Sequence, residues 1–207
     1  MKPIFSGNSD IEKSAFMNWR TSKQEDIQNM LVLAEGFLSS AIELAKASLA
    51  DNSDKKADML IFPILTNANH GIELYLKSLV WTLNKLLNSQ YKIEGKHNIK
   101  QILDTAKAKI KEYKDQETLD YFNQQTEDLQ NYINELFDII QATPEKKDKM
   151  DFSRYPFDQK YSNHFYVDEI GNIEVDLENF VLRFEKILDT LDEIVSYFFY
   201  QELNQEW

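Results

Sequence analysis

Three ionisable side chains share one face of the most regular apolar stretch of the chain, residues 65–87. His70, Glu73 and Lys77 are spaced i, i+3 and i+7, which places them on one side of a helix. A histidine that titrates near neutral pH, an anion and a cation together could bind or activate a polar ligand. Glu73 and Lys77 also have the favourable i,i+4 orientation of a helical ion pair, worth about 0.2–0.5 kcal/mol. The pattern is compatible with two interpretations. One is a ligand site, and the other is a structural ion pair with His70 capping a neighbouring loop.

The sequence predicts neither a metal centre nor a bound cofactor. The chain has no cysteine, and its three histidines (His70, His97 and His164) lie far apart in the sequence on different expected elements. Zinc sites need ligands at closer, characteristic spacings. Glycine-rich phosphate loops, HExxH, GxSxG and EF-hand patterns do not occur.

Charge argues against a general attraction to nucleic acid, because the 207-residue chain carries a formal net charge of −12. Residues 92–114 are an exception, with seven lysines and three acidic residues. Such a run is typical of a solvated helix face. A local surface for an anionic ligand is the alternative.

Composition and periodicity predict an all-α fold. Only five glycines and four prolines are present, too few for the many tight turns of a sheet protein. The beginning of the sequence has no apolar signal-peptide core, and no apolar run approaches the ~18 residues of a membrane span. We therefore expect a cytoplasmic protein that does not enter membranes.

The expected architecture is an up-and-down bundle of about five long helices with a small β-hairpin inserted before the last helix. Residues 1–21 are expected to be peripheral, with one short helix at 11–19, and residues 22–207 to form one domain. The expected helices are residues 22–50, opened by a Ser22/Glu25 capping box, 55–87, a third from 97, 117–140, and a last one capped by Asp176.

Three details qualify this architecture. Pro63 should kink the second helix or mark a late start. His97 should cap the third helix or bond an adjacent loop, and Thr126 is the one polar member of the apolar seam of the fourth. The hairpin is expected to pair residues 164–167 with 173–175 around Gly171 and Asn172.

The last helix predicts a homodimer. Its apolar residues recur at strict four-three spacing from Leu177 to Phe198, and the end, residues 197–200, is aromatic on nearly every side. A terminal helix that is apolar all round is either buried or covered by another chain. We expect the second arrangement.

Three short motifs together resemble the HEPN superfamily of helical domains. They are Asn69-His-Gly-Ile-Glu-Leu-Tyr-Leu-Lys77 in a long helix, Gly95-Lys-His-Asn-Ile99 opening the next, and Ser153-Arg-Tyr-Pro-Phe157 before the closing helix. The resemblance spans roughly residues 55–200. It implies a dimeric, cytoplasmic prokaryotic module, often tied to toxin–antitoxin or phage-defence systems. It also implies ligand contacts from Tyr155 of the third motif, beside those of His70, Glu73, Lys77 and His97.

Active members of that superfamily are metal-independent ribonucleases in which a histidine follows an arginine after four to six residues. Here nine residues separate Arg154 from His164. RNA cleavage by 2′-OH attack needs a proton-transfer group and a cation at the phosphate. Arg154 could clamp phosphate and His164 could move the proton. Alternatively, Arg154 pairs with a bundle carboxylate such as Glu73, and His164 is an ordinary strand residue.

The sequence thus leads to three functional hypotheses. The first is a non-catalytic or weakly catalytic HEPN-like module that dimerises and binds RNA, a nucleotide or a partner protein. The second is a ribonuclease toxin that uses Arg154 and His164. The third is a helper subunit of a separately encoded nucleotidyltransferase.

Overall fold

The computed structural model describes residues 2–23, 25–92, 97–141, 150–158, 160–168 and 171–204, without the side chains of Phe165 and Asp168. Over these residues the chain is helical and contains no β-strand, which confirms the all-α fold class. No helix in this part of the chain is long and apolar enough to cross a bilayer. Residues 95 and 96 of the second superfamily-like motif fall outside the described residues.

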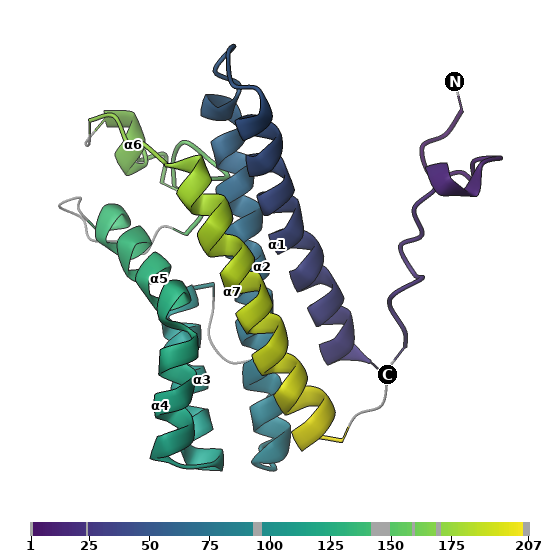
Figure 1. Ribbon diagram of the computed structural model, residues 1–207, viewed down its shortest axis with the longest axis vertical. Helices are drawn as coiled ribbons and strands as arrows, with labels where there is room; N and C mark the ends of the chain where they lie inside the picture. The colour runs from purple at the N-terminus through teal and green to yellow at the C-terminus, as the bar shows by residue number, and fades with distance from the viewer. Residues whose placement is uncertain are drawn as a thin grey trace.

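The centre of the bundle is formed by α1 (Asp26–Ala50) and α2 (Ala57–Leu86), with α7 (Leu177–Ser196) packed alongside them (Figure 1). Gly71 of α2 lies at the closest contact with α1. A Cβ atom added there would stand 2.9 Å from both Cβ and the backbone nitrogen of Leu38. Glycine therefore allows the two helices to approach more closely than any larger residue would.

The helix expected at 117–140 is two helices, α4 (Gln116–Gln125) and α5 (Glu127–Ile140), which follow α3 (Ile99–Tyr113). The break is at Thr126, the polar member of the predicted seam. Its backbone departs from helical geometry (φ −93°, ψ 19°), and its buried hydroxyl donates to the carbonyl of Phe122 at 2.7 Å. A threonine that bonds to its own preceding turn competes with the helical ladder.

Pro63 lies inside α2, which begins six residues earlier, so the late start is not seen. Proline cannot donate to the carbonyl four residues before it. That carbonyl belongs to Met59, a residue on the exposed side of the helix. The missing bond therefore leaves a backbone group where water can reach it.

The predicted capping box at the start of α1 is wrong. Glu25 precedes the helix, but its side chain makes no capping hydrogen bond. The backbone of Ser22 instead pairs with Asn29, whose side-chain oxygen accepts from the Ser22 N–H at 2.9 Å and whose amide donates to the Ser22 carbonyl at 2.8 Å. Asn29, one turn inside α1, thus fixes the position of the chain that leads into the helix.

The predicted β-hairpin is not formed by the described residues. The expected first strand is mostly the short helix α6 (Phe165–Asp168), and residues 171–176 run without a strand partner. The chain before α6 folds on itself: Phe157 and Asn163 form an antiparallel bridge, and the N–H of His164 donates to the carbonyl of Pro156 at 2.9 Å. The His164 N–H, at the start of the predicted first strand, is therefore bonded to the chain before it.

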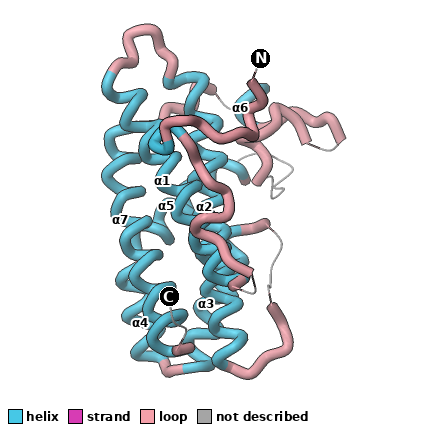
Figure 2. The backbone as a smooth tube through the Cα atoms, turned by 90° about the vertical axis from the view of Figure 1, so that its right-hand side faces the viewer, coloured by secondary structure: helices cyan, strands magenta, loops and turns pink. Residues whose placement is uncertain are grey.

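Residues 2–23, which we call the N-terminal arm, run outside α1 (Figures 1 and 2). The helix expected at 11–19 is limited to one 3-10 turn, Ile11–Lys13. No residue of the arm that the structure describes is buried.

The aromatic end of the last helix forms a π-helical turn, Tyr197–Glu202, that is covered within the chain. Phe198 is 4% exposed and Phe199 2%, and Phe199 packs with Ile27 and Trp81. Phe198 and Phe199 of this aromatic end are therefore already covered within their own chain, whereas Tyr197 remains 40% exposed.

Candidate functional site

Three side chains predicted from sequence surround one carboxylate, that of Glu73. Glu73 of α2 accepts from Lys77 Nζ at 2.7 Å, and His97 Nδ1 lies 2.9 Å from the same oxygen, Oε1. His70 Nδ1 lies 4.0 Å from the other oxygen. Helical spacing brings the three α2 residues together. His97 lies directly before Asn98, and its side chain extends toward α2. Asn98 is the cap of α3, since its side chain accepts from the Gln101 N–H at 2.9 Å.

The electrostatics of this cluster favour a structural role. Burial of Glu73 alone would raise the pKa of its carboxyl group, but the bonds from His70, Lys77 and His97 outweigh it and lower that pKa to about 2. A carboxylate with so low a pKa is a poor proton acceptor near neutral pH. The cluster is well suited to tying the start of α3 to the middle of α2.

Arg154 and His164 lie in different surroundings. The Arg154 side chain belongs to an exposed residue, and its backbone N–H donates to the carbonyl of Asp151 at 2.9 Å. His164 is 0% exposed, and its Nε2 lies 3.6 Å from Oδ1 of Asp151. The Glu73 contacts described above come from α2 and His97, and Arg154 is not among them. The fold therefore does not present both predicted catalytic groups to solvent.

Tyr155, the remaining predicted contact residue, is 56% exposed. Its carbonyl accepts from the hydroxyl of Tyr166 at 3.1 Å. This bond fixes the backbone around the third superfamily-like motif against the chain near α6. The phenol ring itself is available to solvent.

The lysine-rich run at 92–114 is largely engaged within the chain. Lys107 donates to Gln130 at 2.6 Å, and Lys114 pairs with Glu202 at 2.8 Å. Lys100 lies above the ring of Phe137, and Lys92 lies above that of Trp81. Lys96 is outside the described residues. These contacts leave fewer free cations for a phosphate ligand than the sequence suggested.

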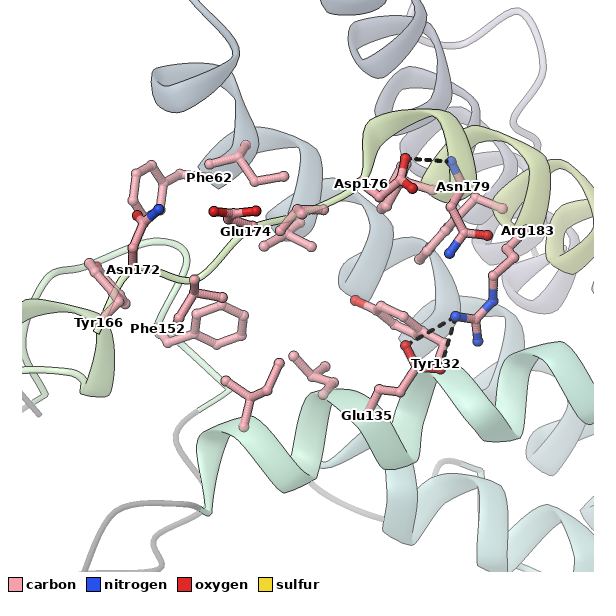
Figure 3. Close-up of a pocket in the computed structure, with 18 of the residues that line it drawn as sticks. Phe62, Tyr132, Glu135, Phe152, Tyr166, Asn172, Glu174, Asp176, Asn179 and Arg183 are labelled. Carbon is pink, nitrogen blue, oxygen red and sulfur yellow. Dashed lines mark hydrogen bonds and ion pairs between the residues drawn. The ribbon is translucent and has the colours of Figure 1, made fainter. Parts of the chain in front are cut away.

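A cleft of about 720 Å³ lies between α2, α5, α7 and the described parts of segment 150–176 (Figure 3). Sequence reasoning did not find it. In Figure 3, Phe62, Phe152 and Tyr166 lie toward one end, and Arg183 and Glu135 lie at the other. The apolar side chains that line it are Ile61, Phe62 and Leu65 of α2, Leu136 and Ile139 of α5, Phe180 and Phe184 of α7, and Phe152, Tyr166, Ile173 and Val175.

An ion pair closes the polar end of this cleft. Arg183 of α7 donates to both carboxylate oxygens of Glu135 of α5, at 2.9 and 3.0 Å. A second guanidinium nitrogen lies 3.3 Å from the carbonyl of Asp128. Beneath them the Tyr132 hydroxyl donates to the side-chain oxygen of Asn69 at 2.7 Å, and burial raises the pKa of this phenol. These bonds hold α5 at a fixed distance from α2 and α7.

Among the described residues, no group of three or more histidine, aspartate or glutamate side chains is arranged to hold a metal ion. Comparisons with family models, with curated proteins and with solved structures find no match to this chain.

Proposed function

We propose that this chain is a non-catalytic, HEPN-like binding module that receives an apolar segment of a partner protein in the cleft. The observation that carries the proposal is the cleft itself, which has apolar walls contributed by three helices and a rigid polar end. A concave apolar site with a few fixed polar groups is the usual form of a binding site. The resemblance supplies the setting, a prokaryotic cytoplasmic defence or toxin–antitoxin system.

Charge favours a protein segment over RNA or a nucleotide as the ligand. Arg183 is the one cation among the described residues that line the cleft, and it is already paired with Glu135. Two further carboxylates, Glu174 and Asp176, lie exposed at its border. Asp176 caps α7 by accepting from the N–H groups of Glu178 and Asn179. A phosphate group would therefore meet the carboxylate of Glu174 and no unpaired cation among the described lining residues.

Binding of an apolar ligand in the cleft is tested by titration with the neutral apolar dye Nile red, whose fluorescence emission is measured. The titration uses the lowest protein concentration that gives a measurable emission signal. Ile139→Glu places a charge on a half-exposed wall residue and is expected to abolish the blue-shifted emission. Leu182→Glu is the matched control, because Leu182 is 62% exposed on α7 and does not line the cleft. Equal dye binding by both variants would show that the cleft does not take apolar ligands.

The ribonuclease hypothesis is tested with total cellular RNA and no added metal. Because His164 has no exposed surface, neither the wild type nor Arg154→Ala is expected to cleave. Cleavage by the wild type that disappears in Arg154→Ala would establish a ribonuclease and overturn the non-catalytic assignment. Circular dichroism of both proteins confirms that each is folded.

A further inference from the structure

Two features of the described residues are complementary: an N-terminal arm with exposed apolar side chains, and a cleft with apolar walls. Six large apolar side chains of the N-terminal arm are exposed, some almost completely. They are Ile4 (94%), Phe5 (92%), Met17 (86%), Trp19 (71%), Ile11 (63%) and Phe16 (47%). Exposed apolar groups in such number mark an interaction segment.

We propose that the N-terminal arm of one copy occupies the cleft of a second copy, with Ile4 and Phe5 as the inserted residues. This inference rests on the proposed function and names the partner segment. Exchanged identical arms would give a two-fold dimer in which each subunit both donates and receives. Ile4 and Phe5 have the two most exposed large apolar side chains among the described residues, and they are adjacent near the far end of the arm.

Charge complementarity supports this occupant. The arm carries Lys2, Lys13, Arg20 and Lys23 against Asp10 and Glu12, so it is net positive in a chain whose total charge is −12. Lys2 is two residues from Ile4. It would therefore arrive near the exposed carboxylates Glu174 and Asp176 at the border of the cleft.

Geometry favours a second copy over the arm's own cleft. The base of the arm, residues 19–22, borders α1 and α7 at a separate hollow that includes Asp192 and Tyr200. From there the arm runs beyond α1, on the side of the bundle away from α5 and α6 (Figure 1). Fully extended, its seventeen or so residues would reach roughly 55 Å, which is ample to cross to a neighbouring molecule.

The test is sedimentation equilibrium of the full chain and of an arm variant, Ile4→Asp/Phe5→Asp, together with binding of a synthetic peptide of residues 2–21. The arm has no buried residue, so the substitutions leave the bundle intact. We expect a wild-type dimer whose association weakens by about tenfold or more in the arm variant, as for the loss of a buried apolar anchor. We also expect the peptide to bind the arm variant and to lose that binding when Ile139→Glu is added.

Four results would overturn the inference. A dimer that survives the arm substitutions but is lost in Leu182→Glu would place the interface on the last helix. A monomeric wild type that excludes the peptide while the arm variant binds it would place the arm in its own cleft. An arm variant that binds Nile red in the cleft but does not bind the peptide would refute the arm as occupant and leave the proposed function standing. An arm variant that binds neither Nile red nor the peptide would refute both the arm inference and the proposed function.

Discussion

His97 Nδ1 lies 2.9 Å from Oε1 of Glu73, the same oxygen that accepts from Lys77. Since Glu73 is ionised, the proton of the shared hydrogen bond belongs to the imidazole, which donates. His97 stands just before α3, and Glu73 is in the middle of α2. The bond therefore fixes where the chain re-enters the bundle after the loop that follows α2.

Glu73→Gln is expected to destabilise the fold in a pH-dependent way. The pKa of Glu73 falls from an ordinary value of 4.5 to about 2 in the fold. Its ionisation therefore contributes stability above about pH 4.5 that is lost as the pH falls toward 2. Urea unfolding at pH 7 should show a loss of about 1–3 kcal/mol in the free energy of unfolding. The difference from wild type should shrink by pH 3.

The control for that variant is Glu43→Gln, which removes an exposed carboxylate paired with Lys46 at 3.2 Å. No measurable change is expected there, because exposed ion pairs contribute little. If Glu73→Gln cost the same at pH 3 as at pH 7, its effect would come from packing and not from ionisation.

Gly71→Ala and Gly36→Ala should act in opposite directions. At Gly71 the new methyl group would press on the backbone of Leu38, which cannot move away, and overpacking of this kind costs about 1–3 kcal/mol. At Gly36 of α1 nothing lies within 4 Å, so alanine should stabilise the helix by about 0.5–1 kcal/mol. Thermal unfolding of the two variants beside wild type checks both signs. A stabilising Gly71→Ala would show that α1 and α2 are not in close contact.

Tyr132→Phe removes the hydroxyl that donates a hydrogen bond to the Asn69 side chain, beneath the cleft. Leaving a buried polar group without its partner costs about 1–3 kcal/mol. Tyr121→Phe is the matched control, since Tyr121 is 62% exposed, and it should leave the unfolding midpoint unchanged. Nile red binding by Tyr132→Phe should weaken along with stability, because the same bond positions the cleft wall. Unaltered stability would mean that water replaces the hydroxyl.

Local features of the fold were predictable from sequence, because they depend on neighbouring residues. The helical spacing that unites Glu73 with Lys77 and the capping of α7 by Asp176 are of this kind. Thr126 gave a signal, a polar residue in an apolar seam, but the pattern alone does not show whether a helix continues through such a position.

Features that depend on distant residues could not be predicted. Residues 164–167 and 173–175 around Gly171 and Asn172 predicted a hairpin, yet the backbone of His164 bonds to Pro156 and a helix follows. The approach of His97 to Glu73 depends on how the chain between α2 and α3 returns to the bundle, which the sequence pattern does not show. The cleft exists because some apolar side chains of α2, α5 and α7 do not pack against one another. Helical periodicity predicts which residues form the apolar faces, but it does not predict where a gap remains between these faces.

The contacts of the lysines in 92–114 have a consequence for how fast this molecule meets others. Lys114 is paired with Glu202, and Lys107 is held against Gln130. The long-range field of the chain follows its formal net charge of −12. Diffusional encounter with a basic surface should therefore be accelerated at low ionic strength and slow as salt is added. Encounter with a polyanion should show the reverse dependence, rising as salt screens the repulsion.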